Sequence, residues 1–450
     1  MRCESIILAA GLGTRMNSSL PKLLQPLAGQ PMIRWSALAC QEATSNDPFL
    51  IVPPDGTAIG EAAGGSSRWI EQSEPLGTGH AVLQAAERLD GETDLVLVVN
   101  ADMPLLSGDT LRSLVEAQST SSGVVTLLTS INKQSRGFGR IVRDEKGSVS
   151  GIVEQAEANS DELALTELNV GAYCFDSEWL WKELANVPIS PKGEYYLTDV
   201  IGLATKGGER IGAIQVNDPD ETIGVNTMEH LAQADAAARR RINRQLMAAG
   251  VRMIDPNTTY IDVEVSIGPG TVILPNTHLE GQTVIGDECR IGPNSILRNA
   301  SVARGCVIEA SVVDKAELEA GVDVGPFARL RPGARLGPGV HVGNFGEIKD
   351  STLAAGVKVG HFSYLGDATI GENVNIGAGT ITCNYDGKRK NATTIHEGAF
   401  IGSDTMLVAP VTIGVGARTG AGAVVTKDVP DHMLAAGVPA RVIRKLEPDD

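Results

Sequence analysis

The hydrophobic positions of this chain follow two different patterns, one in each half. In the first half, short apolar runs at 5–10, 95–99, 124–128 and 151–153 alternate with stretches of helical spacing such as 81–89. Such runs, bounded by turn residues, indicate buried strands, and their alternation with helices predicts a mostly parallel α/β sheet covered on both faces. We therefore expect ligands to bind beyond the carboxyl ends of the strands.

One long helix is predicted between the two halves. Apolar residues recur at helical spacing through 227–249, and Gly250 follows in the position of a C-cap. At 1.5 Å per residue this helix spans about 33 Å. We expect one domain over 1–226, a linker helix over 227–250 and a second domain over 251–450.

The second half has a period of six. Apolar residues six positions apart are Ile267, Ile273, Leu279, Ile285 and Ile291, then Leu318, Val324, Leu330, Leu336, Val342 and Ile348, then Leu353, Val359 and Leu365, then Ile370 and Ile376, and finally Ile395, Ile401, Leu407 and Ile413. A triangular parallel β-helix has this period, because each coil has three short faces with one inward aliphatic side chain per face. Glycine, at 51 of 450 residues, suits its tight corners.

The segment 382–393 interrupts this repeat with polar and turn-forming residues. We expect it to leave the β-helix as a loop. Loops carried on rigid scaffolds are common sites of function.

The composition of the chain excludes some classes of binding partner and indicates the cellular compartment. The 38 basic and 55 acidic residues give a net charge of −17, which disfavours nucleic acid and anionic membranes as partners. The six cysteines are scattered without a CxxC pair, so a reducing, cytoplasmic setting is expected rather than a disulfide framework or zinc cluster. No apolar run approaches the ~20 residues of a membrane-spanning helix, and the first residues lack the apolar core of a signal peptide.

A glycine-rich turn follows the first predicted strand, in Leu8-Ala9-Ala10-Gly11-Leu12-Gly13-Thr14-Arg15-Met16. The backbone N–H groups of such a turn can hold phosphate, and Arg15 and Lys22 add two cations. The string lacks the Gly-Lys-Ser/Thr of a P-loop, which argues against an ATPase of that type. An ordinary tight turn is the alternative interpretation.

This string, with Pro21-Lys22 downstream, resembles the signature of sugar-1-phosphate nucleotidyltransferases. Further strings in both halves run in family order from about residue 5 to 445. The chain is thereby identified as a member of the bifunctional N-acetylglucosamine-1-phosphate uridyltransferase/glucosamine-1-phosphate acetyltransferase family.

The resemblance implies a Rossmann-like nucleotidyltransferase domain, a linker helix and a left-handed parallel β-helix, assembled as a homotrimer. It also implies two reactions that use Mg²⁺ and small-molecule substrates. Acetyl-CoA first acetylates glucosamine-1-phosphate, and UTP then uridylylates the N-acetylglucosamine-1-phosphate formed.

In the first half, the resemblance implies that one set of residues binds UTP and the sugar nucleotide: Leu8, Ala9, Ala10, Gly11, Gly13, Lys22, Gln72, Gly77, Thr78, Gly139, Glu154, Asn169 and Asn226. Arg15 and Lys22 would neutralise the departing pyrophosphate, and Gln72 would read the imide edge of uracil. Asp102 and Asn226 would hold Mg²⁺ through oxygen atoms. A helix N-cap is the alternative role for Asp102, and Ala101 stands where the family usually has glycine. The string 193–199 also fits the family, in a supporting role.

In the second half, the string 359–367 resembles the catalytic segment of the family, and this resemblance implies that His361, among seven histidines, is the general base. The resemblance assigns glucosamine-1-phosphate to Arg331, Lys349, Tyr364 and Asn375, and acetyl-CoA to Ala378, Asn384, Tyr385, Ser403 and Ala421. Glu347 would orient the His361 ring, and Lys390 would support substrate binding in a neighbouring subunit. Gly346 departs from the larger residue usual in the family. The basic tail 441–445 is either a contact for coenzyme A phosphates or a plain surface helix.

Four alternative interpretations are open. His361 is also compatible with a structural corner histidine, or with a zinc site that includes His341. A nucleotidyltransferase of ADP-glucose pyrophosphorylase type, with a merely regulatory β-helix, would not need His361, Tyr364 and Asn384-Tyr385. A noncatalytic assembly subunit would be expected to have lost Arg15, Lys22 or Asp102, and this chain has all three.

Overall fold

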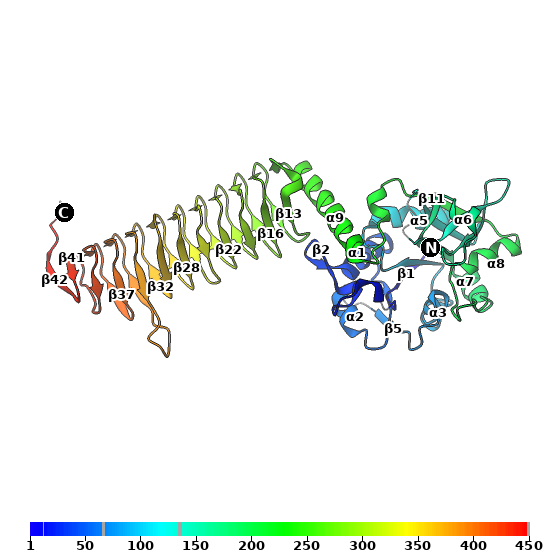
Figure 1. Ribbon diagram of the computed structural model, residues 1–450, viewed down its shortest axis with the longest axis horizontal. Helices are drawn as coiled ribbons and strands as arrows, with labels where there is room; N and C mark the ends of the chain where they lie inside the picture. The colour runs from blue at the N-terminus through cyan, green and yellow to red at the C-terminus, as the bar shows by residue number, and fades with distance from the viewer. Residues whose placement is uncertain (12, 65–67, 134–136, 448–450) are drawn as a thin grey trace. The chain divides into compact units, whose positions relative to one another are not determined.

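The computed structural model describes residues 1–11, 13–64, 68–133 and 137–447 (Figure 1). Contacts divide the chain into two compact units, Met1–Ala238 and Arg239–Asp450. The division falls within helix α9 (Met228–Ala248), which closely matches the helix predicted over 227–249. None of the described helices combines the length and apolar character that a membrane crossing requires.

The first unit is built on one large sheet. Its strands are β1 (Cys3–Leu8), β4 (Phe49–Val52), β5 (Arg68–Glu71), β6 (Leu95–Asn100), β7 (Val125–Ile131), β8 (Arg140–Arg143), β9 (Val149–Val153), β10 (Glu167–Asp176) and β11 (Ile211–Gln215). Along the main path the order is β11-β7-β10-β6-β1-β4-β5, and β8 pairs with β9 and β10. A separate hairpin joins β2 (Pro26–Leu27) to β3 (Gln30–Pro31).

Most pairs along this path are parallel, as predicted, but β10 runs antiparallel to both of its neighbours, β6 and β7. The hairpin of β8 and β9 is also antiparallel. The side chains of β6 are all buried up to Val99. Because successive side chains of a strand point to opposite faces, the sheet is covered on both sides at β6.

Helices and short 3₁₀ turns connect the strands. The helices are α1 (Met32–Thr44), α2 (Thr57–Ala63), α3 (Thr78–Leu83), α4 (Ala86–Leu89), α5 (Gly108–Thr120), α6 (Ser160–Leu163), α7 (Ser177–Leu184) and α8 (Asp199–Gly207). The 3₁₀ turns are η1 (Thr14–Met16), η2 (Lys22–Leu24), η3 (Pro219–Thr222) and, in the second unit, η4 (Pro256–Thr258). The stretch 81–89 is helical, as predicted, but in two pieces, because α3 ends at Leu83 and α4 begins at Ala86.

The second unit is a parallel β-helix of three sheets. The first contains β12 (Arg252–Met253), β15 (Val272–Ile273), β18 (Arg290–Ile291), β21 (Val307–Ile308), β24 (Asp323–Val324), β27 (His341–Val342), β30 (Lys358–Val359), β33 (Asn375–Ile376), β36 (Phe400–Ile401), β39 (Arg418–Thr419), β41 (Met433–Gly437) and β42 (Ala440–Lys445). The second contains β13 (Thr259–Ile261), β16 (Thr277–Glu280), β19 (Ile296–Arg298), β22 (Val312–Asp314), β25 (Arg329–Leu330), β28 (Gly346–Lys349), β31 (Ser363–Gly366), β34 (Ile381–Cys383), β37 (Met406–Val408) and β40 (Val424–Val425). The third contains β14 (Ser266–Ile267), β17 (Val284–Ile285), β20 (Ser301–Val302), β23 (Glu317–Leu318), β26 (Arg335–Leu336), β29 (Thr352–Leu353), β32 (Ala368–Ile370), β35 (Thr393–Ile395) and β38 (Val411–Ile413).

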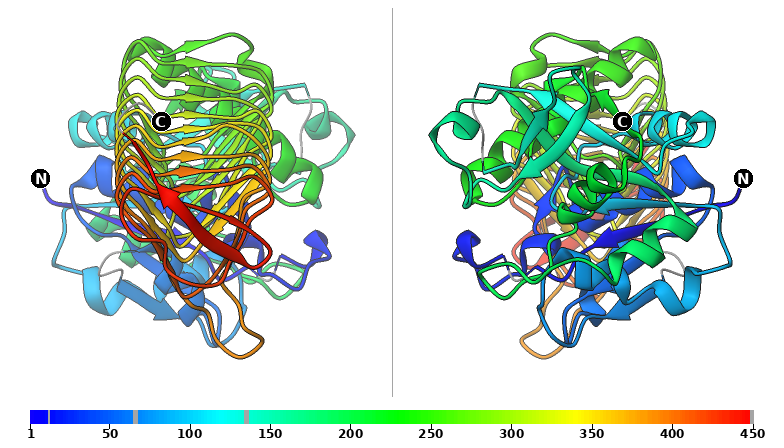
Figure 2. Two further views of the ribbon diagram at one scale, coloured as in Figure 1. Left: turned by 90° about the vertical axis from the view of Figure 1, so that its left-hand side faces the viewer. Right: turned by 90° about the vertical axis from the view of Figure 1, so that its right-hand side faces the viewer.

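Every third strand therefore joins the same sheet, up to the hairpin of β41 and β42, which confirms the three-faced coil predicted from the period of six. Figure 2 shows the coils following one another, with β42 crossing the last of them. Ile267 is the register partner of Ile285, so a full coil consists of three hexads. Val302 is the register partner of Leu318, so the coil between them is shorter than three hexads. Such shorter coils explain why the sequence repeat slips before Leu318.

The interruption of the repeat at 382–393 contains a loop, as predicted, between β34 and β35. Ala368 is the register partner of Thr393, so the coil between them is longer than three hexads. The extra residues leave the coil as a protruding loop, closed by a bridge between Tyr385 and Lys390 (Figure 1). The tail forms the antiparallel strand β42, so the alternative of a surface helix there is wrong.

Candidate functional site

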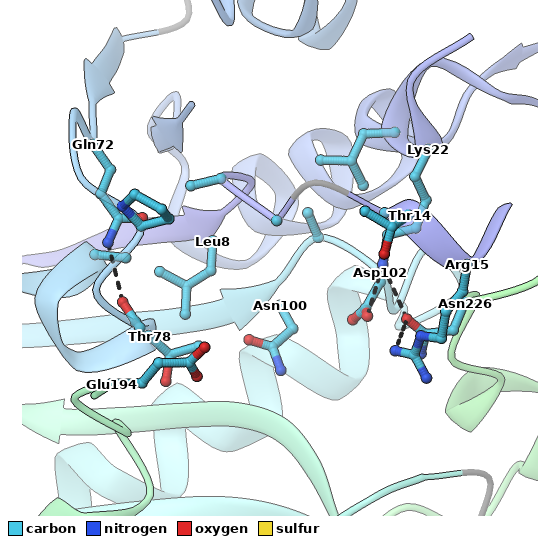
Figure 3. Close-up of a pocket in the computed structure, with 18 of the residues that line it drawn as sticks. Leu8, Thr14, Arg15, Lys22, Gln72, Thr78, Asn100, Asp102, Glu194 and Asn226 are labelled. Atoms are coloured by element: carbon cyan, nitrogen blue, oxygen red, sulfur yellow. Dashed lines mark hydrogen bonds and ion pairs between the residues drawn. The ribbon is translucent and has the colours of Figure 1, made fainter. Parts of the chain in front are cut away.

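A cavity of about 580 Å³ lies at the carboxyl ends of β1 and β6 (Figure 3). Leu8 and Asn100, the last residues of these two strands, are register partners and both line it. The lining is completed by Ala10, Gly11, Gly13, Thr14, Arg15, Lys22, Leu23, Gln72, Pro75, Gly77, Thr78, Ala81, Ala101, Asp102, Glu194, Tyr196 and Asn226. The structure thus brings together most of the nucleotide-site residues expected from the sequence.

One end of the cavity is charged. Lys22 Nζ donates to Asp102 Oδ2 at 3.1 Å and to Asn226 Oδ1 at 3.2 Å, and Arg15 Nη2 donates to the same Asn226 oxygen at 2.9 Å. The Lys22 side chain is only 10% exposed. The Val225 N–H donates to the Asp102 carbonyl at 2.9 Å, which holds Asn226 beside the end of β6. The alternative of Asp102 as a helix N-cap is wrong, because Ser107 caps α5.

Gly13 allows Lys22 to reach this position. Gly13 has φ = +61°, and a Cβ atom there would lie 2.6 Å from Lys22 Cβ. An L side chain would be strained in this conformation and would press on the lysine stem. The glycine of the turn is therefore needed for a close approach as well as for backbone freedom.

The other end of the cavity is uncharged apart from Glu194. The buried Gln72 donates through Nε2 to the Gly77 carbonyl at 3.1 Å. Gly77 has φ = +101°, and a Cβ atom there would lie 2.6 Å from the Tyr195 carbonyl oxygen. Only glycine lets these two segments meet so closely.

A second cavity of about 330 Å³ shares Arg15 and Tyr196 with the first and is also lined by Gly137, Glu154, Gln155 and Ala156. Burial raises the pKa of the Glu154 carboxyl above its usual value of 4.5, and the Thr198 hydroxyl, which donates to it at 3.0 Å, opposes that rise.

Three of the predicted nucleotide-site residues line neither of these two cavities: Ala9, Gly139 and Asn169. Ala9 is buried, and its N–H donates to the Ile51 carbonyl at 2.8 Å. The Asn169 N–H donates to the Gly139 carbonyl at 2.9 Å, and its side-chain amide donates to Tyr173 Oη at 2.7 Å.

Sequence reasoning gave Glu194 and Tyr196 only a supporting role, and it left Asn100 and Thr14 unassigned. The structure places all four on the cavity wall. The Tyr195 N–H donates to the Leu76 carbonyl at 2.8 Å, and this hydrogen bond places residues 194–196 beside the segment that contains Gly77. The string 193–199 marked this segment as typical of the family, but it did not indicate where the segment lies in the fold.

On the β-helix, a second group of predicted residues gathers on the sheet of β25, β28 and β31. Arg331 and Lys349 each lie two residues beyond a register pair, Arg329 with Glu347, so they occupy neighbouring coils. Glu347 is in turn the register partner of Tyr364. Asn384 Nδ2 lies 3.5 Å from Tyr364 Oη, which brings the base of the loop to the same sheet.

Glu347 contacts a partner other than the one expected. Arg331 Nη1 donates to Glu347 Oε1 at 2.8 Å, and this bond raises the pKa of the Arg331 guanidinium. Between the described residues no hydrogen bond joins Glu347 to His361. In the structure Glu347 is thus paired with Arg331, and its role in orienting the His361 ring stays a prediction.

The two lysines of this group influence each other. Lys349 donates to Asp350 Oδ2 at 2.6 Å, which raises the pKa of its ammonium. The neighbouring Lys349 lowers the pKa of Lys390 from its ordinary value. Like charges held together in this way favour the binding of an anion between them.

His361, Ala378, Ser403 and Ala421 share one corner of the β-helix. Tyr364, Ile381, Met406 and Val424 are successive register partners, and each of the four corner residues lies three positions before one of them. His361 is exposed at this corner. The residues expected to meet the acetyl donor thus form one column, whereas Asn375 lies on the adjoining sheet in β33.

The zinc alternative gains no support from the geometry. His341 Nδ1 lies 2.8 Å from Asp323 Oδ2. Across the described ranges, no group of three or more His, Cys, Asp or Glu side chains is placed to hold a metal ion.

Comparisons with known proteins agree with this division of the chain. Residues 5–165 match the MobA-like NTP transferase domain, 264–299 match the bacterial transferase hexapeptide repeat, and 392–427 match the hexapeptide repeat of succinyl-transferase. These matches, with the cavity and the coils, define a nucleotidyltransferase joined to a hexapeptide-repeat transferase. The N-terminal unit is accordingly Rossmann-like, and the coils form a left-handed β-helix.

Similar proteins match nearly the whole chain. The bifunctional protein GlmU of Heliobacterium modesticaldum is 45% identical over 96% of this chain and 94% of its own length. That of Exiguobacterium sibiricum is 46% identical over 99% of both chains, and that of Streptococcus suis is 45% identical over 96% of this chain and 94% of its own. The chain belongs to the bifunctional GlmU family, and it is an enzyme of both acetyl transfer and uridylyl transfer, as the sequence predicted.

Proposed function

We propose that the cavity at the ends of β1 and β6 performs uridylyl transfer from UTP to N-acetylglucosamine-1-phosphate. The observation that carries this proposal is the convergence of Lys22 and Arg15 on Asp102 and Asn226 at one end of a cavity that Gln72 and Gly77 close at the other. A triphosphate fits the cationic end and a base fits the uncharged end.

The reaction is an in-line displacement. A phosphate oxygen of the sugar phosphate attacks the α-phosphorus of UTP, the bond to the β-phosphate oxygen breaks, and pyrophosphate leaves. Such a reaction needs little beyond positioning and neutralisation of charge. Arg15 and Lys22 supply the neutralisation, and Glu154 in the adjoining cavity is the acceptor we assign to a sugar hydroxyl.

The donor set of this site fits Mg²⁺. Asp102 Oδ2 and Asn226 Oδ1 both lie within 3.2 Å of the same ammonium nitrogen, so the two oxygens can face a single cation. Carboxylate and amide oxygens are ligands that Mg²⁺ accepts, with substrate phosphates and waters completing its octahedron. A bound Mg²⁺ would supply charge neutralisation at the phosphates, and Lys22 would then turn from the two oxygens towards the triphosphate.

We assign acetyl transfer to the corner column and the neighbouring sheet of the β-helix. His361 would take a proton from the amine of glucosamine-1-phosphate as that nitrogen attacks the thioester carbon of acetyl-CoA. The carbon–sulfur bond then breaks, and coenzyme A leaves as the thiol after its sulfur takes that proton from His361. Arg331 and Lys349 would hold the sugar phosphate, and the Ala378 N–H would face the thioester oxygen.

Residues 1–226 would carry the uridylyl reaction and 251–450 the acetyl reaction, which comes first and supplies the substrate of the other. A homotrimer would let the loop containing Tyr385 and Lys390 reach the substrate of a neighbouring copy. The six free thiols are in keeping with a cytoplasmic location.

The test mixes the full-length protein with Mg²⁺, acetyl-CoA, glucosamine-1-phosphate and UTP and weighs the products. The complete mixture should yield coenzyme A, pyrophosphate and UDP-N-acetylglucosamine. Omitting UTP should leave N-acetylglucosamine-1-phosphate as the product. Formation of UDP-glucosamine without acetyl-CoA at the same rate would contradict the proposed order.

A further inference from the structure

His80 lies outside the cavity lining, but a chain of hydrogen bonds joins its ring to the base end of the cavity. Gln72 Nε2 lies 3.0 Å from His80 Nδ1 and donates to the Gly77 carbonyl at 3.1 Å. On the other side of the ring, Gln84 Nε2 lies 3.1 Å from His80 Nε2 and 3.1 Å from the His80 carbonyl. Gln72 is 4% exposed, whereas Gln84 is half-buried.

The contacts of Gln72 fix which way its amide points. The Gly77 carbonyl can only accept a hydrogen bond, so the amide nitrogen of Gln72 must face it. The second N–H of that nitrogen then points at His80 Nδ1, which must be the acceptor. Amide and imidazole orientations are set by such networks, and here the Gly77 carbonyl and His80 Nδ1 together hold the amide nitrogen of Gln72.

The imidazole can satisfy only one of the two glutamines in this way. A neutral ring accepts at one nitrogen and donates at the other. With Nδ1 accepting from Gln72, Nε2 carries the proton. Gln84 must then turn its amide oxygen towards Nε2 and give up its hydrogen bond to the His80 carbonyl. Gln84 is the glutamine that can turn, because it is less buried than Gln72.

We infer that His80 is a positioning residue for nucleobase selection, which rests on the proposed uridylyl function. By accepting from Gln72 Nε2, it leaves Gln72 Oε1 as the acceptor offered to the cavity (Figure 3). Uracil has an N–H donor at N3, whereas cytosine has an acceptor there. An amide oxygen at this position therefore favours uracil and opposes cytosine.

The experiment measures kcat/KM for UTP and for CTP, with N-acetylglucosamine-1-phosphate and Mg²⁺, in the wild-type chain and three variants. His80→Phe keeps the ring but removes the acceptor, and we expect the preference for UTP over CTP to fall by about tenfold. The fall should come from KM for UTP, with kcat little changed. His80→Gln offers an amide oxygen in place of Nδ1 and should restore most of the preference. Gln84→Leu, the matched control on the outer side of the ring, should keep it within about twofold.

An equal loss of rate with both nucleotides in His80→Phe, at unchanged preference, would overturn the inference and leave His80 a structural role. If His80→Phe does not fold, ¹⁵N NMR of the wild-type ring decides, with the His80→Gln spectrum as the assignment. The proton is expected on Nε2, and a proton on Nδ1 would overturn the inference. Failure of the proposed function itself is distinguishable, because wild-type protein would then form no UDP-sugar from UTP at all.

Discussion

Lys22 offers a direct test of the charged end of the cavity. Lys22→Met keeps the aliphatic stem that packs beside Gly13 and removes only the ammonium group. At 3.1 Å from Asp102 and an effective dielectric constant of about 20, the lost attraction is about 5 kcal/mol before desolvation is counted. Desolvation offsets most of this, and the Asp102 side chain is 27% exposed and can be hydrated. We expect a net loss of stability of about 1–2 kcal/mol.

The effect on uridylyl transfer should be much larger. The ammonium group faces the position proposed for the triphosphate, and removing one such group typically lowers the rate by about 10²–10³-fold. The assay follows pyrophosphate release from UTP and N-acetylglucosamine-1-phosphate at saturating Mg²⁺, with coenzyme A release as the readout of the other reaction. Lys206→Met, at an exposed lysine of α8, is the matched control and should leave both rates unchanged. Pyrophosphate release within about twofold of wild type in Lys22→Met would refute the reasoning.

Two further predictions concern carboxylates. The pKa of Glu154 is raised mainly by burial, so the stabilising contribution of its protonated form is complete below the ordinary value of 4.5 and is lost as the pH rises through the higher folded value. Glu154→Gln should therefore raise the melting temperature at pH 7–8, with a gain that vanishes near pH 4; an equal gain at both values would contradict the burial argument. Because Glu347 holds Arg331, Glu347→Gln should raise KM for glucosamine-1-phosphate several-fold while the pH profile of acetyl transfer stays that of the wild type. A shift of that profile would instead return Glu347 to His361.

Much of the fold could be predicted because its signals are local. The period of six survives in the sequence since each coil repeats the same environment at each face, and coils shorter or longer than three hexads disturb it. The long helix over 228–248 carries its own apolar spacing and end signal. The antiparallel position of β10 has no such local signal, because pairing direction depends on where distant strands lie.

In the candidate site, too, the residues with a local sequence signal could be predicted, and those placed by distant segments could not. The glycine-rich turn and Lys22 could be found from a contiguous string. Glu194 and Tyr196 reach the cavity through backbone hydrogen bonds that Tyr195 makes with Leu76 and Gly79, which no spacing in the sequence reveals. The choice of Glu347 between two possible partners is likewise decided by the register of neighbouring coils.

The proposed assignments give one chain two independent reaction centres. The most direct test measures both reactions in Asp102→Ala and in His361→Ala, with each protein's melting curve as the check on folding. We expect Asp102→Ala to lose uridylyl transfer and keep acetyl transfer, and His361→Ala to show the reverse. Loss of both reactions in either well-folded variant, or retention of uridylyl transfer without the carboxylate of Asp102, would contradict the account.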